Sequence, residues 1–136
     1  MSQPYSLPFI LARLGLSLAL RTRMTSPTHD ERTAVPEASR LIAQRLGKAL
    51  HPDAIYLFGS HARGDANADS DLDLMVIVPE SNQTRYVRGV EARRLVSDIA
   101  TPKDIVVLTR KEWQEGQQVV CSLASAVRRE GILLHG

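Results

Sequence analysis

The run Ser70–Leu74 alternates between acidic and apolar side chains, and this alternation constrains the fold more than any other feature of the chain. Successive side chains of a β-strand point to opposite faces of its sheet, so the carboxylates of Asp71 and Asp73 share one face. Leu72 and Leu74 share the other face and are expected in the core. Two carboxylates this close together repel and raise each other's pKa unless a divalent cation lies between them. Mg²⁺ is the expected cation, because it prefers a few carboxylates together with substrate phosphates over a closed protein cage.

The run Gly59–Gly64, Gly-Ser-His-Ala-Arg-Gly, lies shortly before the acidic pair and follows a predicted strand over residues 54–58. A glycine lets backbone N–H groups approach a phosphate closely, and the start of a helix favours negative charge. Ser60 adds a hydroxyl donor. The spacing matches neither the Walker loop, since no Gly-Lys-Ser/Thr follows, nor the dinucleotide-binding Gly-x-Gly-x-x-Gly. A phosphate-sized turn coupled to paired carboxylates indicates nucleotide chemistry.

The complete constellation resembles the minimal nucleotidyltransferases, which are small members of the polymerase-beta-like nucleotidyltransferase superfamily. The motif reads Gly-Ser-x-Ala-Arg-Gly, a polar spacer and Ser-Asp-Leu-Asp-Leu, and the resemblance extends over residues 35–136. It implies that Asp71 and Asp73 bind Mg²⁺ together with a third carboxylate from a neighbouring strand. Asp104, which opens the run Asp-Ile-Val-Val-Leu, matches that place. The full spaced motif is far more specific than either half alone.

The resemblance also indicates where a nucleotide binds. It implies that Gly59 and Ser60 hold a nucleoside triphosphate, with Arg63 and Ser70 as further candidates for nucleotide binding. Arg63 touches either a phosphate or only solvent, and both interpretations stay open. His61 is interpreted as a turn residue and not as a base.

The implied reaction is nucleotidyl transfer with release of pyrophosphate, and Asp71, Asp73 and Asp104 are the catalytic candidates. One Mg²⁺ on Asp71 and Asp73 would bind the triphosphate of ATP, and a second would activate the acceptor hydroxyl with help from Asp104. Asp104 is also the candidate general base. The alternative is that the two motifs are ordinary turns beside a solvated acidic edge, with Asp104 simply beginning a strand.

The chain is too short for a second substrate domain, so something else is expected to complete the site, and the resemblance implies that this is a partner protein. In the resembling family, domains of this size are commonly encoded beside HEPN-domain proteins as toxin-antitoxin pairs. There the transferase is the antitoxin, and it transfers AMP from ATP onto a tyrosine of the HEPN ribonuclease. A non-catalytic antitoxin that acts by binding is one alternative. A small-molecule transferase of the aminoglycoside type is another, although those enzymes carry an added helical domain. A homo- or hetero-oligomer is the expected assembly.

Length and composition bound the remaining functions. At 136 residues with 43% hydrophobic side chains, the chain is expected to form one globular domain. Residues 36–136 carry 13 basic and 13 acidic side chains, so this part lacks the basic excess of a strong nucleic-acid binder. The single cysteine, Cys121, excludes an internal disulfide and favours a reducing, cytoplasmic location. Cys121 lies in an apolar stretch and is predicted to be buried.

Residues 1–35 differ from the rest of the chain, since they carry four arginines against two acidic side chains. The apolar stretch 6–20 is shorter than a membrane span of about 20 residues and lacks the basic region that precedes the core of a secretory signal. We expect a disordered or loosely packed extension over 1–35, or a start at Met24, and no membrane association. An interfacial amphipathic helix is the alternative. The transferase domain is expected over 36–136.

Apolar spacing and turn residues predict alternating helices and strands over the domain. The expected elements are a helix from Pro36 to before Pro52, strands over 54–58, 72–78 and 104–109, helices over about 83–99 and 113–130, and an edge strand over 132–134. The expected fold class is therefore α/β (α+β), with a small mixed sheet and helices packed mainly on one face.

Individual side chains in the two later helices carry their own predictions. The helix over 83–99 is expected to pack Ala92, Leu95, Val96 and Ile99. It is expected to expose four arginines, Arg85, Arg88, Arg93 and Arg94, either as a solvated face or as a contact with a nucleotide or an acidic partner. The helix over 113–130 is expected to bury Val120, Leu123 and Val127, with Trp113 as a packing residue and Gly131 as a left-handed cap.

Overall fold

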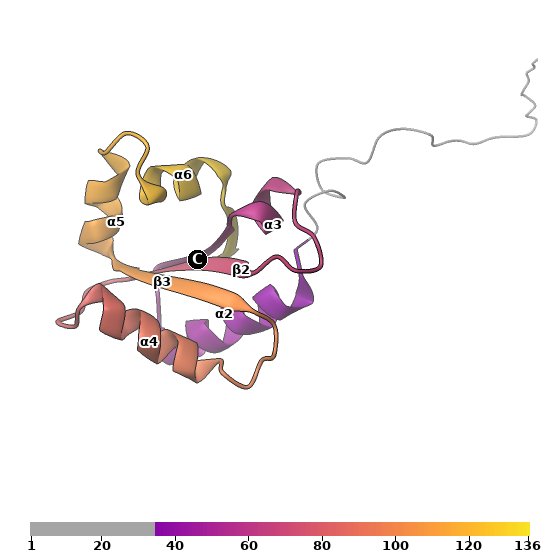
Figure 1. Cartoon of the computed structure of the whole chain (residues 1–136). Coiled ribbons are helices and arrows are strands. Elements are labelled where there is room, and N and C mark those ends of the chain that lie inside the picture. The colour runs from indigo at the N-terminus through magenta and orange to yellow at the C-terminus, as the bar shows by residue number, and fades with distance from the viewer. Residues whose placement is uncertain (1–34) are drawn as a thin grey trace, which may run out of the picture. The chain divides into compact units, whose positions relative to one another are not determined.

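The computed structural model describes residues 35–136, which form a four-stranded sheet with helices on both faces (Figure 1). The predictions for residues 1–35 and Met24 lie outside the described residues, apart from Val35, which packs against the core. The strands are β1 (Ala54–Phe58), β2 (Leu72–Val78), β3 (Lys103–Thr109) and β4 (Ile132–His135). Their order across the sheet is β3-β2-β1-β4.

The sheet is mixed, as predicted. Strand β1 runs antiparallel to both β2 and β4, whereas β2 and β3 are parallel. The strands over 54–58 and 72–78 begin and end where the sequence placed them, and β4 is an edge strand as expected. Apolar runs bounded by turn residues therefore predicted the strands of the sheet correctly.

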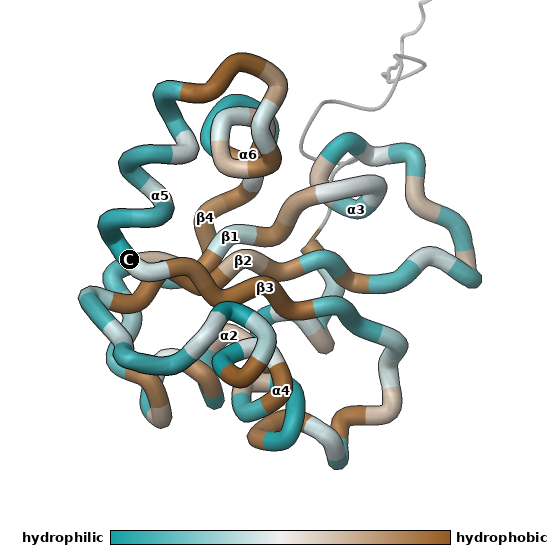
Figure 2. Tube along the Cα trace, turned by 60° about the vertical axis from the view of Figure 1, so that its left-hand side comes forward, coloured by the Kyte–Doolittle hydropathy of each residue, from teal (hydrophilic) through white to brown (hydrophobic). Residues whose placement is uncertain are grey.

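The two longest helices, α2 (Glu37–Leu50) and α4 (Arg85–Leu95), pack on one face of the sheet, and the opposite face carries shorter helices (Figure 2). These are α3 (Ser60–Arg63), α5 (Arg110–Gln117) and α6 (Leu123–Glu130). Alternate residues of β2 enter the two cores: Leu74 and Val76 pack under α2 and α4, whereas Met75 and Ile77 pack under α6. Asp73, between Leu72 and Leu74 in β2, thus belongs to the face of the shorter helices.

Helix α4 is shorter than the predicted 83–99. Thr84 begins it by accepting a hydrogen bond from the Val87 N–H at 3.2 Å, and the helix ends at Leu95. Ala92 and Val96 are fully buried as predicted. The prediction for Leu95 was wrong, because Ala92 and Val96 occupy the inward face and leave Leu95 40% exposed. The prediction for Arg88 was also wrong, since its side chain is buried among hydrogen-bond acceptors.

The predicted single helix over 113–130 is two helices, α5 and α6. Thr109 and Ser122 each accept a backbone hydrogen bond at a helix start, and between the helices Cys121 adopts a φ of 66°. Val127 is buried, but Val120 and Leu123 are exposed in and beside this break.

Two further predictions near this break were wrong. Cys121 is exposed and not buried, because it lies in the connection between the two helices. Gly131 is extended, with φ −73° and ψ 153°, and is not a left-handed cap. A side chain at Gly131 would meet the Val127 carbonyl oxygen at 2.5 Å, so close backbone approach explains the glycine.

Trp113 packs as predicted, with its ring stacked on Tyr56 at a centroid distance of 5.4 Å. None of the helices within residues 35–136 combines the length and apolar character needed to cross a membrane.

Candidate functional site

The parallel pairing of β2 and β3 sets Asp73 directly beside Asp104. These two residues are register partners, and both belong to the face of the sheet that carries α6. Asp71 immediately precedes β2, two residues before Asp73, so strand alternation assigns it to the same face. Asp73 is half-buried, whereas Asp71 and Asp104 are exposed. The structure therefore brings the three predicted carboxylates to the beginning of two neighbouring strands.

The negative charge of Asp73 lies in an unfavourable environment. Burial raises the pKa of Asp73 above its ordinary value, and the negative charges of Asp104 and Asp71 raise it further. His61 and Arg63 act in the opposite direction. A carboxylate in this position is stabilised by any cation that settles beside it.

The turn after β1 lies against the same carboxylate. Phe58 is the register partner of Asp73, so the chain leaves β1 at Gly59 directly beside it. Gly59 has φ 75° and ψ −152°, a backbone conformation that is essentially restricted to glycine. A Cβ at Gly59 would overlap Asp73 Oδ2 and lie 3.1 Å from Asp73 Cγ. Glycine is required here both by the conformation and by the neighbouring carboxylate.

Helix α3 is a single turn that closes on Gly59. The backbone N–H groups of Ala62 and Arg63 donate to the Gly59 carbonyl oxygen at 3.1 and 3.0 Å, and Gly64 ends the turn at φ 85°. Ser60 follows Gly59 and is half-buried. The predicted order of strand, glycine turn and short helix is therefore present.

The side chains of the other two nucleotide-binding candidates, Arg63 and Ser70, contact residues of the loop before β2. Arg63 is half-exposed, and its Nε lies 3.3 Å from Asp65 Oδ2. Ser70 Oγ accepts from the Asn67 N–H at 2.9 Å, which shapes the loop before β2. The Ser70 carbonyl oxygen contacts His61 Nε2 at 3.3 Å, so His61 of α3 ties this helix to the loop.

Sequence reasoning did not foresee the contact between Asp104 and Arg93. Arg93 of α4 places Nη1 3.8 Å from Asp104 Oδ1, and both side chains are largely exposed. The arginine belongs to the helix packed on the opposite face, and it reaches Asp104 at the edge strand β3. The four arginines of one helix gave no signal for a partner on a strand.

The donor set suits a hard divalent cation that completes its coordination with substrate oxygens. All three candidate side chains are carboxylates, and Asp73 is destabilised by its like-charged neighbours. Within residues 35–136, no group of three or more His, Cys, Asp or Glu side chains is arranged so that it could hold a metal ion by itself. Mg²⁺ binding through one or two carboxylates plus phosphate oxygens fits this arrangement.

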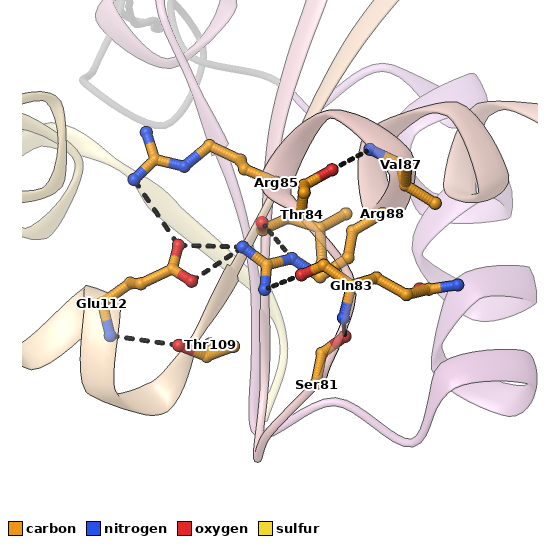
Figure 3. A network of polar contacts seen from close by, with 9 residues as sticks. Ser81, Gln83, Thr84, Arg85, Val87, Arg88, Thr109 and Glu112 are labelled. Carbon is orange, nitrogen blue, oxygen red and sulfur yellow. Dashed lines mark hydrogen bonds and ion pairs between the residues drawn. The ribbon is translucent and has the colours of Figure 1, made fainter.

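A second polar cluster lies at the other end of β2 and β3, around the buried Arg88 (Figure 3). Arg88 Nη2 donates to both carboxylate oxygens of Glu112 at 2.9 and 2.8 Å, and Nε donates to the Val107 carbonyl oxygen at 3.2 Å. Burial raises the pKa of Glu112, but the hydrogen bonds and charge of Arg88 outweigh it, so the pKa is lowered overall. A cavity of about 370 Å³ adjoins Arg88 and Val78, away from the aspartates. The cluster joins α4 to α5 and is structural.

Comparison with known proteins supports this fold. The sequence model of the nucleotidyltransferase domain matches residues 39–133. A crystal structure of a Sulfolobus solfataricus protein considered to be a nucleotidyltransferase is similar, with a TM-score of 0.51 and 19% identity, over 82% of this chain and 90% of that one. A crystal structure of a toxin-antitoxin with AMP-PNP is similar with a TM-score of 0.52 and 24% identity, over 74% of each chain. No curated protein matches. At these identities the solved structures show the fold.

Proposed function

The chain belongs to the nucleotidyltransferase domain family, and from this premise we propose that it transfers AMP from ATP onto a hydroxyl group of a partner protein. One observation carries the proposal. Asp73 lies beside Asp104 on the neighbouring strand, shares its face of the sheet with Asp71 and contacts the glycine turn, so a triphosphate on the turn would lie beside acidic side chains.

The roles of the residues follow from their positions. Gly59 lets the backbone approach a phosphate without a side chain in the way, and Ser60 offers a hydroxyl donor beside it. Asp71 and Asp73 would hold Mg²⁺ with Asp104, and the bound ion supplies positive charge that neutralises the triphosphate. Arg63 can turn from Asp65 toward a phosphate, because both side chains are largely exposed.

Asp104 is the general base in this proposal. The acceptor oxygen forms a bond to the α-phosphorus, the bond from that phosphorus to the oxygen bridging it to the β-phosphate breaks, and pyrophosphate leaves. The hydroxyl proton passes to the Asp104 carboxylate, which is exposed and therefore within reach of an acceptor from outside the domain. Arg93 keeps this carboxylate at the edge of β3.

We further propose that the acceptor is a HEPN-domain ribonuclease and that the chain is its antitoxin. Two considerations support this choice. The carboxylates Asp71 and Asp104 are exposed at the surface of the domain, where a macromolecule can reach them. A protein of the same fold was solved as a toxin-antitoxin with AMP-PNP. Modification of a toxin's tyrosine hydroxyl would silence it.

The test is a labelling experiment with the purified protein, α-labelled ATP, Mg²⁺ and lysate of its own host. The double variant Asp71→Asn/Asp73→Asn is compared with wild type and with Asp69→Asn, which removes an exposed carboxylate from the loop before β2. A macromolecule labelled by wild type and Asp69→Asn, but not by the double variant, supports nucleotidyl transfer and identifies the acceptor.

Two other results would contradict parts of the proposal. Absence of label, with a partner still captured by wild type and the double variant alike, indicates an antitoxin that acts by binding. Label found only on a small molecule retains nucleotidyl transfer and rejects the protein acceptor.

A further inference from the structure

A groove along the edge strand β4 takes no part in the proposed reaction. It lies between α2 and β4 and has a volume of about 640 Å³. Figure 2 shows β4 beyond β1 at the border of the sheet, in the colour of hydrophobic residues. Apolar and polar residues line it in similar measure: Val35, Leu41, Ile132 and Leu133 are among the apolar ones, and Glu37, Arg40, Gln44 and His135 are the polar ones.

The two edges of the sheet are treated differently. At the β3 edge, α4 covers the backbone: Arg88 Nε donates to the Val107 carbonyl oxygen, and a Cβ at Gly89 would lie 3.3 Å from the Ile105 carbonyl oxygen. Strand β4 pairs with β1 on its inner side, and no residue between 35 and 136 pairs with its outer side. Natural proteins usually protect such an edge with charge, proline or a covering segment.

Two of the exposed side chains in the groove are large and aliphatic. Leu41 is 42% exposed and Leu133 is 53% exposed, one on each side of the groove. Large apolar side chains gathered beside an open strand edge are characteristic of a surface that pairs with another chain.

The groove carries an acidic and a basic side chain, so its charges can complement those of a second copy of the same groove. Glu37 and Arg40 lie three residues apart on α2, and within the described part of the chain neither belongs to an ion pair. A two-fold axis brings a surface against its own copy, so a surface carrying one unpaired acid and one unpaired base can satisfy both across such an axis.

We propose that a second copy of this chain docks in this groove, with β4 antiparallel to β4 of its partner and α2 beside the partner's helix. The interface buries Leu41 and Leu133, and the Glu37 carboxylate of each copy pairs with the Arg40 guanidinium of the other. The two sheets join into one continuous sheet. Because β1 separates β4 from β2, the aspartates of both copies remain open.

Sedimentation equilibrium of the full chain tests the proposal. The wild type is expected at twice the monomer mass of 15.0 kDa. Leu133→Glu is expected to weaken dimerisation at least about tenfold, with an unchanged far-UV circular dichroism spectrum. Leu123→Glu, a matched change at an exposed leucine of α6, is expected to leave the dimer intact.

A charge-reversal series tests the pairing itself. Glu37→Arg and Arg40→Glu each place like charges together and should weaken the dimer, whereas the double variant exchanges the two charges and should restore it. A monomeric wild type overturns the proposal, and so does a Leu133→Glu dimer as tight as wild type. Failure of the double variant to recover the dimer overturns the two-fold pairing.

Discussion

The backbone of Gly59 lies against the carboxylate of Asp73, so closely that a methyl group on the glycine would overlap that carboxylate. The contact joins the two halves of the sequence motif. The glycine turn follows Phe58, the last residue of β1, and Phe58 is the register partner of Asp73 in β2. The glycine is therefore part of the geometry of the carboxylate site as well as a flexible turn residue.

Gly59→Ala is expected to lower the rate of nucleotidyl transfer by about a hundredfold or more. The substitution strains the backbone at a cost of about 1–3 kcal/mol. The added methyl group also displaces Asp73 from its place beside the other carboxylates. Gly64→Ala is the control, because Gly64 also has a positive φ, of 85°, and alanine there adds strain at the other end of α3. Transfer measured with α-labelled ATP should survive in Gly64→Ala. Equal losses in both variants would mean that strain alone explains the effect.

Asp73→Asn is expected to lose transfer and yet to raise the melting temperature of the metal-free protein by about 1–3 °C. Burial and the charges of Asp104 and Asp71 raise the pKa of Asp73, so its negative charge is unfavourable in the folded state. Solvent screening keeps the gain below about 0.5 kcal/mol. Asp53→Asn should instead lower the melting temperature, because Asp53 accepts two hydrogen bonds from Arg110 at 2.6 and 2.8 Å. A lower melting temperature for Asp73→Asn would contradict the repulsion.

Mg²⁺ is expected to raise the melting temperature of wild type by relieving the same repulsion. A cation that binds the folded protein and not the unfolded chain stabilises the fold in proportion to its binding. The shift should vanish in Asp71→Asn/Asp73→Asn and persist in Asp69→Asn, as measured by differential scanning calorimetry with and without Mg²⁺. A shift that is equal in all three proteins would place Mg²⁺ elsewhere on the surface.

The sheet and the carboxylates were predictable from the sequence because they depend on local alternation. The run Ser70–Leu74 determines which side chains face the core, and a strand with strict alternation has only one register that buries its leucines. The position of Asp104 followed from the resemblance, and the parallel register of β2 and β3 now sets it beside Asp73.

The features that were missed depend on distant parts of the chain. The break between α5 and α6 ends at Ser122, whose hydroxyl accepts from the Ser125 N–H at 3.0 Å and also donates to the Gly116 carbonyl oxygen. Helical periodicity continues through that region and conceals the break. Arg88 can be buried because Glu112 and the Val107 carbonyl oxygen accept its hydrogen bonds. Neither partner is near Arg88 in the sequence.

Glu112→Gln is expected to destabilise the fold by about 1–3 kcal/mol, because it leaves the guanidinium of Arg88 buried without a counter-charge. The Arg88 side chain is only 5% exposed. Arg85→Gln is the control: Arg85 also approaches Glu112, at 3.5 Å, but is 63% exposed and should cost less than about 0.5 kcal/mol. Urea unfolding at neutral pH measures both. Equal effects would show that the burial of Arg88 adds nothing.

The ion pair between Arg88 and Glu112 makes the stability of the fold depend on pH in the acid range, and Glu112→Gln should remove this contribution. Arg88 holds the pKa of Glu112 below its ordinary value of about 4.3, so the unfolded chain binds the proton more readily than the folded one. The stabilisation is complete above that ordinary value and is lost as pH falls through the lower, folded pKa. Urea unfolding between about pH 6 and pH 3 should therefore show a steeper loss of stability in wild type than in Glu112→Gln.

Asp53 and Asp98, whose pKa values are also lowered, are present in both proteins, so the difference between the two curves isolates Glu112. Glu115→Gln, which changes an exposed carboxylate of the same helix, should follow the wild-type curve. Parallel curves for wild type and Glu112→Gln would show that Arg88 does not depend on the charge of its partner.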